Sequence, residues 1–296
     1  MESQIKTAFA GNSENFESYR KTLNRFDTDV VFSGAWFSNE KPENYTENEF
    51  ESYDELLENS DAVFFFGDKI RKKLIADAIK SCKHIFIDDY SSLLNSDVRQ
   101  LYELASEADI AAQVSFPKTY FWGIEDLPEE HPKIRNIFFY REYIYHQQKQ
   151  ETDLMPEILS SIKLINDDVI RANSLSIPMI PKRTEMKVIN LEFRNGAASS
   201  ITGVPVGFVE RHDLRIIAER SLAYVDLRRR EWHSLKPAKA ITGKLIKGLA
   251  GLPEVGDIEQ FEIQDFIDSI KDRIDPFVSF KDMVDLNNCL KLIEDK

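Results

Sequence analysis

Fully apolar segments alternate with amphipathic segments over the first part of the chain. Ala62–Phe66 reads AVFFF, and Lys69–Ser81 follows it with apolar residues at helical spacing. A strand that is apolar at every position is buried on both faces, as in a parallel sheet covered by helices. We therefore predict an α/β domain over residues 1–118, with a Rossmann-like, doubly wound parallel sheet. The other expected elements are strands at Ile5–Ala10, Asp29–Phe32, Ile85–Ile87 and Ile110–Val114, and helices at Glu14–Phe26, Tyr53–Leu57 and Ser96–Ala108.

After about Pro117 the pattern changes to consecutive strands. Ile134–Tyr145 is rich in β-forming residues, and Asn195-Gly196 marks a hairpin turn. Such a succession predicts an α+β domain over residues 119–296, with an open, largely antiparallel sheet. The other expected elements are strands at Met186–Phe193, Ala198–Thr202, Leu214–Ile217 and Leu222–Leu227, and helices at Pro156–Ile165, Ile258–Ile270 and Lys281–Ile293.

Charge and composition limit the partners. The net charge is -13 and the pI about 5.0, which disfavours nucleic acid and anionic lipid. Cys82 and Cys289, the only cysteines, provide neither a disulfide framework nor a Cys-rich metal site. No stretch resembles a signal peptide or reaches the ~20 apolar residues of a membrane span. We expect a cytoplasmic protein without a metal, without a nucleic-acid partner and without stable membrane insertion.

The loop after the first strand contains few of the glycines that bind dinucleotides. These glycines let a pyrophosphate approach bare backbone at a helix N-terminus. Gly11 occupies the first glycine position, but Ser13 stands at the second and Phe16 at the third. Gly11, Asn12 and Ser13 are still candidate ligand-binding residues, because Ser13 and free N–H groups are donors. An ordinary tight turn is the reading that these residues favour.

Further candidates follow the next strands. A dinucleotide fold places a carboxylate at the end of its second strand, where it binds the ribose. Here that position reads Phe32-Ser33-Gly34, and Ser33 can supply only one of the hydrogen bonds. Gly67 and Asp68 close the third strand, and Asp88 closes the fourth.

The order of several segments resembles one enzyme family. The quoted segments are YDELLENSDAVFFF, AIKSCKHIFIDDY and LYELASEADIAAQV in the first domain, and FRNGAASSI, IIAERSLAYVD and IEQFEIQDFIDSIKDRIDPFVSFKDMVDL in the second. Together they resemble the Gfo/Idh/MocA oxidoreductases over nearly the whole chain. The resemblance implies a Rossmann domain, a sheet domain that often mediates oligomers, and an NAD- or NADP-dependent reaction on a sugar-like substrate.

The residues at the family's EKP motif differ in charge. The alignment places Asp88 at the glutamate, Asp89 at the catalytic lysine and Tyr90 at the proline. A lysine donates protons and carries positive charge, whereas an ionised aspartate only accepts. Adjacent residues of an extended chain point to opposite faces, so Asp88 and Asp89 are not expected to form an acid/base pair.

The family's second motif, DxGxHxxD, is also altered. Asp153 is kept, but Met155, Glu157 and Ser160 replace the glycine, the histidine and the second aspartate. A buried Glu157 with a raised pKa is a candidate acid or base. The favoured reading is that Asp153 caps the helix and Glu157 complements its dipole.

The remaining polar features carry less information. His131, His146, His212 and His233 lack the spacing of a metal site. Positive charge gathers at residues 228–247, where AITGKLIKGLAGL is a candidate amphipathic helix that docks a partner, covers a cleft or touches lipid. An exposed loop explains the same residues equally well.

The sequence therefore predicts a catalytically degenerate relative that acts as a small-molecule-binding or partner subunit. Two alternatives stay open. One is an active NAD(P)-dependent oxidoreductase with a remodelled site that uses Glu157, Asp89 or Tyr90. The other is a non-redox binder of a nucleotide or sugar. A homodimer is expected through Met186–Thr202 and Leu214–Leu227, because an open sheet exposes apolar side chains unless a second subunit covers it.

Overall fold

The computed structural model divides the chain into two compact units. One consists of Met1–Pro117 and Pro253–Val284, and the other of Lys118–Leu252 and Asp285–Lys296. The sequence placed all of residues 119–296 in the second domain, whereas Pro253–Val284 packs with the first unit. The structure describes residues 4–11, 16–37, 45, 47–67, 72–94, 98–116, 133–143, 154–179, 184–205, 210–229, 231–236, 239–244 and 258–294.

The first unit is built on a parallel sheet. Among the described residues the sheet has five strands in the order β2-β1-β3-β4-β5, and all of its pairings are parallel. This arrangement confirms the predicted doubly wound sheet. Its elements are β1 (Ile5–Gly11), α1 (Phe16–Leu23), η1 (Asn24–Phe26), β2 (Val30–Trp36), α2 (Tyr53–Glu58), β3 (Ala62–Phe66), α3 (Lys72–Lys80), β4 (His84–Ile87), η2 (Tyr90–Leu93), α4 (Val98–Glu107), β5 (Ala112–Val114) and α8 (Ile258–Asp272).

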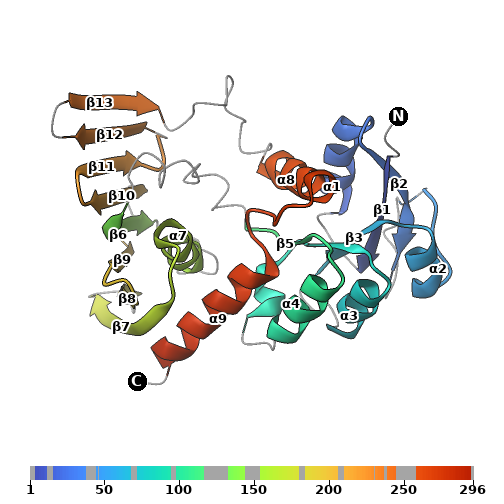
Figure 1. Ribbon diagram of the computed structural model, residues 1–296, viewed down its shortest axis with the longest axis horizontal. Helices are drawn as coiled ribbons and strands as arrows, with labels where there is room; N and C mark the ends of the chain where they lie inside the picture. The colour runs from blue at the N-terminus through green and yellow to red at the C-terminus, as the bar shows by residue number, and fades with distance from the viewer. Residues whose placement is uncertain are drawn as a thin grey trace. The chain divides into compact units, whose positions relative to one another are not determined.

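Helices cover both faces of this sheet. In Figure 1, α1 and α8 lie side by side on one face, and α3 and α4 lie on the other. Every residue of Ala62–Phe66 is buried, as the uninterrupted apolar run predicts. Phe64 stacks on Phe86 of β4 and meets Phe266 of α8 edge-on, with ring centroids 4.8 and 5.4 Å apart. Helix α8, from far along the chain, therefore completes the core of the first unit.

The second unit is a mixed sheet with a helix on one face. Its described strands form one sheet of eight, in the order β13-β12-β11-β10-β6-β9-β8-β7, in which only β6 and β9 pair in parallel. The largely antiparallel character matches the prediction. Its elements are β6 (Ile134–Tyr143), α7 (Met155–Ile165), β7 (Val169–Met179), β8 (Thr184–Phe193), β9 (Ala198–Pro205), β10 (Arg211–Ala218), β11 (Ser221–Asp226), β12 (Glu231–Lys236) and β13 (Lys239–Lys244), and α9 (Phe280–Glu294) is divided between the units.

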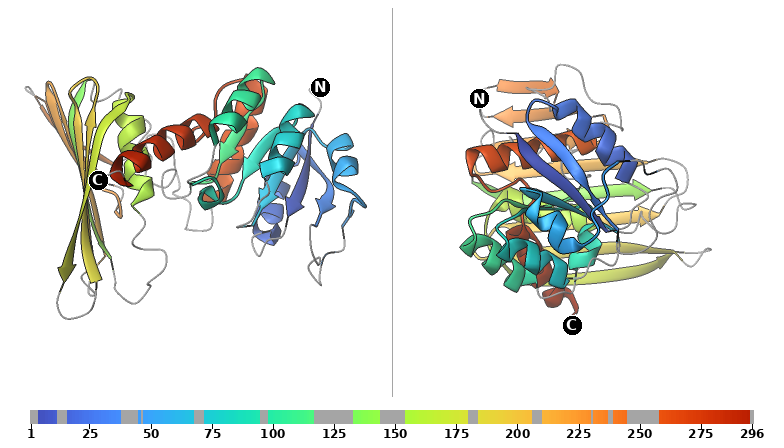
Figure 2. Two further views of the ribbon diagram at one scale, coloured as in Figure 1. Left: turned by 90° about the horizontal axis from the view of Figure 1, so that it is seen from below. Right: turned by 90° about the vertical axis from the view of Figure 1, so that its right-hand side faces the viewer.

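The alternation of side chains gives this sheet an inner and an outer face. Ile137, Phe139 and Leu214 are buried on the inner face, where α7 packs on β6 and β9. Phe138 and Tyr224 point to the outer face and are each 41% exposed. The edge-on view in Figure 2 (left) shows α7 against the inner face, and no described helix on the outer one.

Three segments of the second unit differ from the sequence-based prediction, and one of them is β12 (Glu231–Lys236), where no strand was expected. Val169–Met179 forms β7, which was not anticipated because exposed and polar residues interrupt its apolar pattern. Lys239–Lys244 forms the edge strand β13, paired with β12, and not the start of an amphipathic helix. The spacing of Ile241 with later leucines was therefore misleading here, and those leucines lie outside the described residues.

Candidate functional site

The candidate cofactor residues follow the carboxyl ends of the parallel strands. Gly11 ends β1 and Gly67 follows β3, with φ angles of +114° and +102°. A Cβ atom added to Gly11 would lie 2.3 Å from the Phe66 carbonyl oxygen. The approach of β1 to β3 therefore requires glycine here, whether or not a pyrophosphate binds. Asn12, Ser13 and Asp68 lie outside the described residues.

Aromatic side chains fill the region beside the first turn of α1. Phe16, at the position of the third glycine, is buried and meets Phe9 edge-on at a centroid distance of 4.6 Å. Tyr45 packs on the Phe16 ring at 5.3 Å, and Phe66 lies 6.3 Å from it. Phe32 of β2 belongs to the same cluster, and its ring centroid lies 4.8 Å from that of Phe9. Phe16, the first residue of α1, is thus part of an aromatic cluster.

A later segment of the chain binds the end of β2. The Asn48 side-chain amide donates to the Ser33 carbonyl oxygen at 2.9 Å. The Asn48 carbonyl oxygen accepts the Ala35 N–H at 3.0 Å, and it would lie 2.6 Å from a Cβ atom at Gly34. Glu47, the carboxylate next to Asn48, is paired with Arg20 at 2.8 Å. Amide and backbone groups therefore stand where dinucleotide folds place a ribose-binding carboxylate.

Asp88 and Asp89 bind different partners. The Gly67 N–H donates to Asp88 Oδ1 at 3.2 Å, which links the ends of β3 and β4. Asp89 is the N-cap of η2, and its carboxylate accepts the Ser91 N–H at 2.9 Å and the Ser91 hydroxyl. Tyr90 stacks on Phe116 with ring centroids 4.0 Å apart. Asp89, which the sequence-based resemblance aligns with the family's lysine, thus holds its own turn.

The structure places the remaining candidate, Glu157, in a buried charged cluster of the second unit. Glu157 lies in the first turn of α7 and is completely buried. Its Oε1 atom is 3.2 Å from His212 Nε2 and 3.5 Å from Arg141 Nη1. His212 and Arg141 face each other across β10 and β6. An acid, a guanidinium and an imidazole therefore meet between helix and sheet.

The electrostatics of this cluster favour the ionised carboxylate. Burial by itself would raise the pKa of Glu157, but contact with His212 and the charge of Arg141 outweigh it and leave the pKa below its usual value. Glu157 Oε2 and the nearby Ser160 hydroxyl, both buried, have no hydrogen-bond partner within the described part of the chain. The cluster contains groups that can accept and exchange protons.

This arrangement bears on two sequence-based interpretations. Leu154 is the N-cap of α7 and makes no side-chain capping bond, while Asp153, the expected cap, lies outside the described residues. Glu157 is paired across the helix–sheet interface and does more than complement the helix dipole. Sequence reasoning missed Arg141 and His212. The available signal was that His212, Leu214 and Ile216 occupy every second position of one strand. Residues at this spacing share a face, so the imidazole lies on the same face as the buried Leu214 and Ile216.

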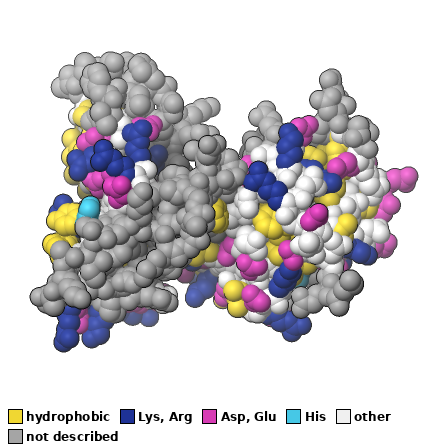
Figure 3. Space-filling view, turned by 90° about the horizontal axis from the view of Figure 1, so that it is seen from above, with side chains coloured by type: hydrophobic (Ala, Val, Ile, Leu, Met, Phe, Trp, Pro, Cys, Tyr) yellow, Lys and Arg dark blue, Asp and Glu magenta, His cyan; other side chains and the backbone are white. Residues whose placement is uncertain are grey.

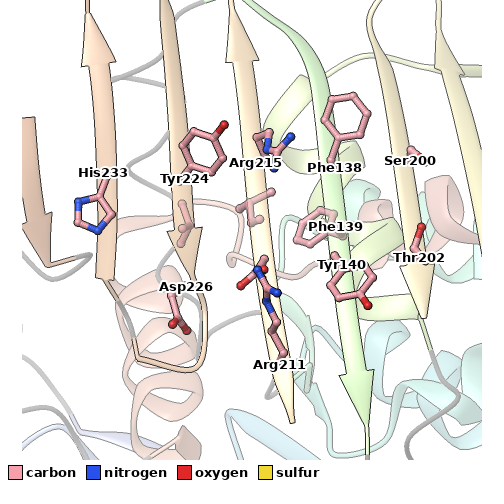
Figure 4. Close-up of a pocket in the computed structure, with 13 residues that line it drawn as sticks. Phe138, Phe139, Tyr140, Ser200, Thr202, Arg211, Arg215, Tyr224, Asp226 and His233 are labelled. Atoms are coloured by element: carbon pink, nitrogen blue, oxygen red, sulfur yellow. The ribbon is translucent and has the colours of Figure 1, made fainter. Parts of the chain in front are cut away.

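A shallow hollow of about 470 Å³ lies on the outer face of the second sheet (Figure 4). One row of paired residues crosses it over five strands: Ser200, Phe138, Arg215, Tyr224 and His233. The Arg215 guanidinium stacks on the Tyr224 ring at 4.7 Å. Exposed aromatic and cationic groups of this kind are typical of surfaces that bind a partner.

The described residues hold no group of three or more His, Cys, Asp or Glu side chains placed to bind a metal ion. None of their helices is long and apolar enough to cross a membrane.

Comparisons of structure define the class of the fold. No family model and no curated protein sequence matches the chain. UDP-N-acetylglucosamine 3-dehydrogenase GnnA from Acidithiobacillus ferrooxidans matches with a TM-score of 0.79 at 16% identity, covering 99% of this chain and 97% of the other. Levoglucosan dehydrogenase in complex with NADH and levoglucosan matches with a TM-score of 0.76 at 12% identity, covering 99% and 97%.

An oxidoreductase from Agrobacterium radiobacter, in complex with NAD+, L-tartaric acid and magnesium, matches with a TM-score of 0.79 at 13% identity, covering 99% and 96%. The fold is therefore that of two-domain, NAD-dependent dehydrogenases. More particularly, it is the fold of the Gfo/Idh/MocA-type oxidoreductases over the full length of the chain, at low sequence identity.

Proposed function

We propose that this chain is a non-redox relative of the Gfo/Idh/MocA oxidoreductases that acts as a small-molecule-binding or partner subunit. The observation that carries the proposal is the buried Phe16 ring at the first turn of α1. A pyrophosphate binds to exposed N–H groups at this place in a dinucleotide fold, and a packed aromatic ring blocks close approach. The neighbouring dehydrogenases bind NAD+ or NADH, but these residues of the present chain do not fit that cofactor in the usual way.

The residues for hydride-transfer chemistry support the same proposal. Asp89 takes the position of the catalytic lysine, and its carboxylate is held by Ser91. An ionised carboxylate cannot donate a proton to a substrate hydroxyl, and its charge repels a dinucleotide phosphate. The Tyr90 ring is stacked on Phe116, with ring centroids 4.0 Å apart.

The alternative, an active oxidoreductase with a remodelled site, is favoured by one observation. Glu157 stands at the position of the motif histidine, and His212 supplies an imidazole 3.2 Å away. A carboxylate that contacts an imidazole is a common arrangement for acid/base catalysis. This alternative requires NAD(P) binding, so cofactor titration separates the two functions.

We predict no saturable binding of NADH or NADPH below ~1 mM, because a pyrophosphate site without its glycines loses most of its backbone hydrogen bonds. Cofactor fluorescence and melting temperature measure the binding, and a dinucleotide-dependent dehydrogenase titrated in parallel is the positive control. A micromolar isotherm would overturn the proposal. So would NAD(P)-linked turnover of a sugar that is lost in Glu157→Gln.

We also propose that the partner is a second copy of this chain, bound through the outer face of the open sheet. Phe138 and Tyr224 are each 41% exposed there, and Leu175 and Leu235 are 56% and 50% exposed. In Figure 3, hydrophobic side chains follow the left margin, where this face is seen edge-on. Exposed aromatic and aliphatic side chains on one open sheet face favour a two-fold symmetric dimer.

Light scattering is expected to give a dimer mass for the wild type. Phe138→Glu is expected to raise the dimer dissociation constant at least tenfold, since burying an aromatic side chain contributes ~1.5–3 kcal/mol. Ile274→Glu, at a residue that is 56% exposed in the first unit, is the matched control and should leave the mass unchanged. A monomer mass over a wide concentration range would remove the dimer.

A further inference from the structure

Glu262 is a carboxyl group sealed inside the first unit. It lies on α8 and is completely buried. The Phe116 N–H donates to its Oε1 atom at 2.7 Å, and the Ser115 hydroxyl lies 2.9 Å from its Oε2 atom. No Lys, Arg or His of the described residues pairs with it. A buried carboxylate without a cation is strongly unfavourable, so the neutral acid is the stable form.

The titratable groups around Glu262 reinforce this preference. On its own helix, Glu259 and Asp265 raise its pKa further. From α1, the Tyr19 hydroxyl is 3.4 Å from the Ser115 hydroxyl, and burial raises the tyrosine pKa. From the end of β4, Asp88 adds negative charge to the field at Tyr19. Burial is the largest cause and raises the pKa of Glu262 to about 8, although the Ser115 and Phe116 hydrogen bonds oppose it.

The same side chain sits where α8 joins the parallel sheet. The Gln113 side-chain amide of β5 donates to the Glu262 carbonyl oxygen at 2.8 Å. The next turn of α8 contributes Ile263, Phe266 and Ile267 to the core. Phe266 meets Phe86 of β4 with ring centroids 5.6 Å apart. A charge at Glu262 would therefore appear inside the interface that holds this helix.

We propose that Glu262 is a proton-dependent latch that holds α8 on the parallel sheet and loosens the helix when the proton is lost. In the closed form the neutral carboxyl accepts the Phe116 N–H at Oε1 and the Ser115 hydroxyl at Oε2. Loss of the proton leaves a negative charge in the interface, and opening of α8 exposes that charge to water. This inference goes beyond the proposed function and is independent of it.

The sign of the pH dependence follows from linkage. Below the ordinary carboxyl pKa of ~4.3, the Glu262 carboxyl is protonated whether α8 is docked or open. The docked form therefore has its full stability in this pH range. Between that value and about 8, the open form releases a proton that the docked form keeps. Opening then becomes up to tenfold more favourable per pH unit, because one proton is exchanged. Above about 8 the effect levels off.

Hydrogen exchange of the α8 amides tests the latch. Each variant is compared with the wild type at the same pH, from 5 to 9, so that the intrinsic exchange rate cancels. The α8 opening constant of the wild type, relative to Glu262→Gln, is expected to rise about tenfold per pH unit between pH 6 and 7. Glu259→Gln is the matched control on the same helix and should keep the wild-type pH dependence.

Two results would overturn the latch. One is the same pH dependence of α8 opening in the wild type and in Glu262→Gln. The other is a carbon NMR titration of the wild type in which the Glu262 carboxyl ionises at the ordinary carboxyl pKa of ~4.3. This measurement does not use the glutamine variant, so it applies even if that variant does not fold.

Discussion

Arg141→Met is expected to destabilise the protein by about 3–5 kcal/mol, because it removes a guanidinium charge that offsets the buried Glu157 carboxylate. Glu157 is completely buried, so its carboxylate cannot turn to water when the guanidinium is lost. Urea denaturation followed by circular dichroism measures the loss. Arg135→Met is the matched control on the same strand. The Arg135 side chain is 48% exposed and is paired with Glu219, so its loss should cost less than ~1 kcal/mol.

The cost of Arg141→Met should also depend on pH. The pKa of Glu157 is lowered in the folded protein, because contact with His212 and the charge of Arg141 outweigh burial. The stability from this carboxylate is present above the ordinary pKa of ~4.3 and is lost as the pH falls through the lowered folded value. The difference between wild type and Arg141→Met should therefore shrink on acidification below about pH 4. Equal losses in Arg141→Met and Arg135→Met would show that the cluster is not energetically coupled.

Gly11→Ala is expected to cost at least ~3 kcal/mol in the absence of any ligand, because the substitution combines backbone strain with a steric clash. The φ angle of +114° is one that alanine rarely adopts. The new Cβ atom would also lie 2.3 Å from the Phe66 carbonyl oxygen. Thermal melting measures the effect.

Gly196→Ala is the control for Gly11→Ala. Gly196 also has a positive φ, of +82°, but an added Cβ atom meets nothing within 4 Å. Only the strain of ~1–3 kcal/mol should remain there. If Gly11→Ala melts like the wild type, this glycine is not needed for the approach of β1 to β3. It would then be a residue that serves a ligand.

The class of fold could be read from the sequence because it depends on local patterns. Ala62–Phe66 is apolar at every position, and only burial on both faces of a parallel sheet satisfies such a strand. Asn195-Gly196 marked the hairpin between β8 and β9 for the same local reason. The expected absence of the motif lysine and histidine likewise rests on single positions, Asp89 and Glu157.

Local patterns were insufficient where a residue's role depends on a distant partner. Alternation along β10 places His212 on the buried face, but nothing in the sequence pairs it with Glu157 on α7. The helical spacing of α8 predicts an apolar face without saying that this face packs on the first unit.

The sequence by itself therefore determined the two kinds of sheet and the residues that stand at the candidate motif positions, because periodicity and residue identity are local. The tertiary structure alone decided what those residues contact. In the folded protein Phe16 packs among the aromatic rings at the strand ends, Asp89 accepts a hydrogen bond within its own turn, and Glu262 is buried beside Ser115. These outcomes depend on contacts between segments far apart in the chain, which no local pattern encodes.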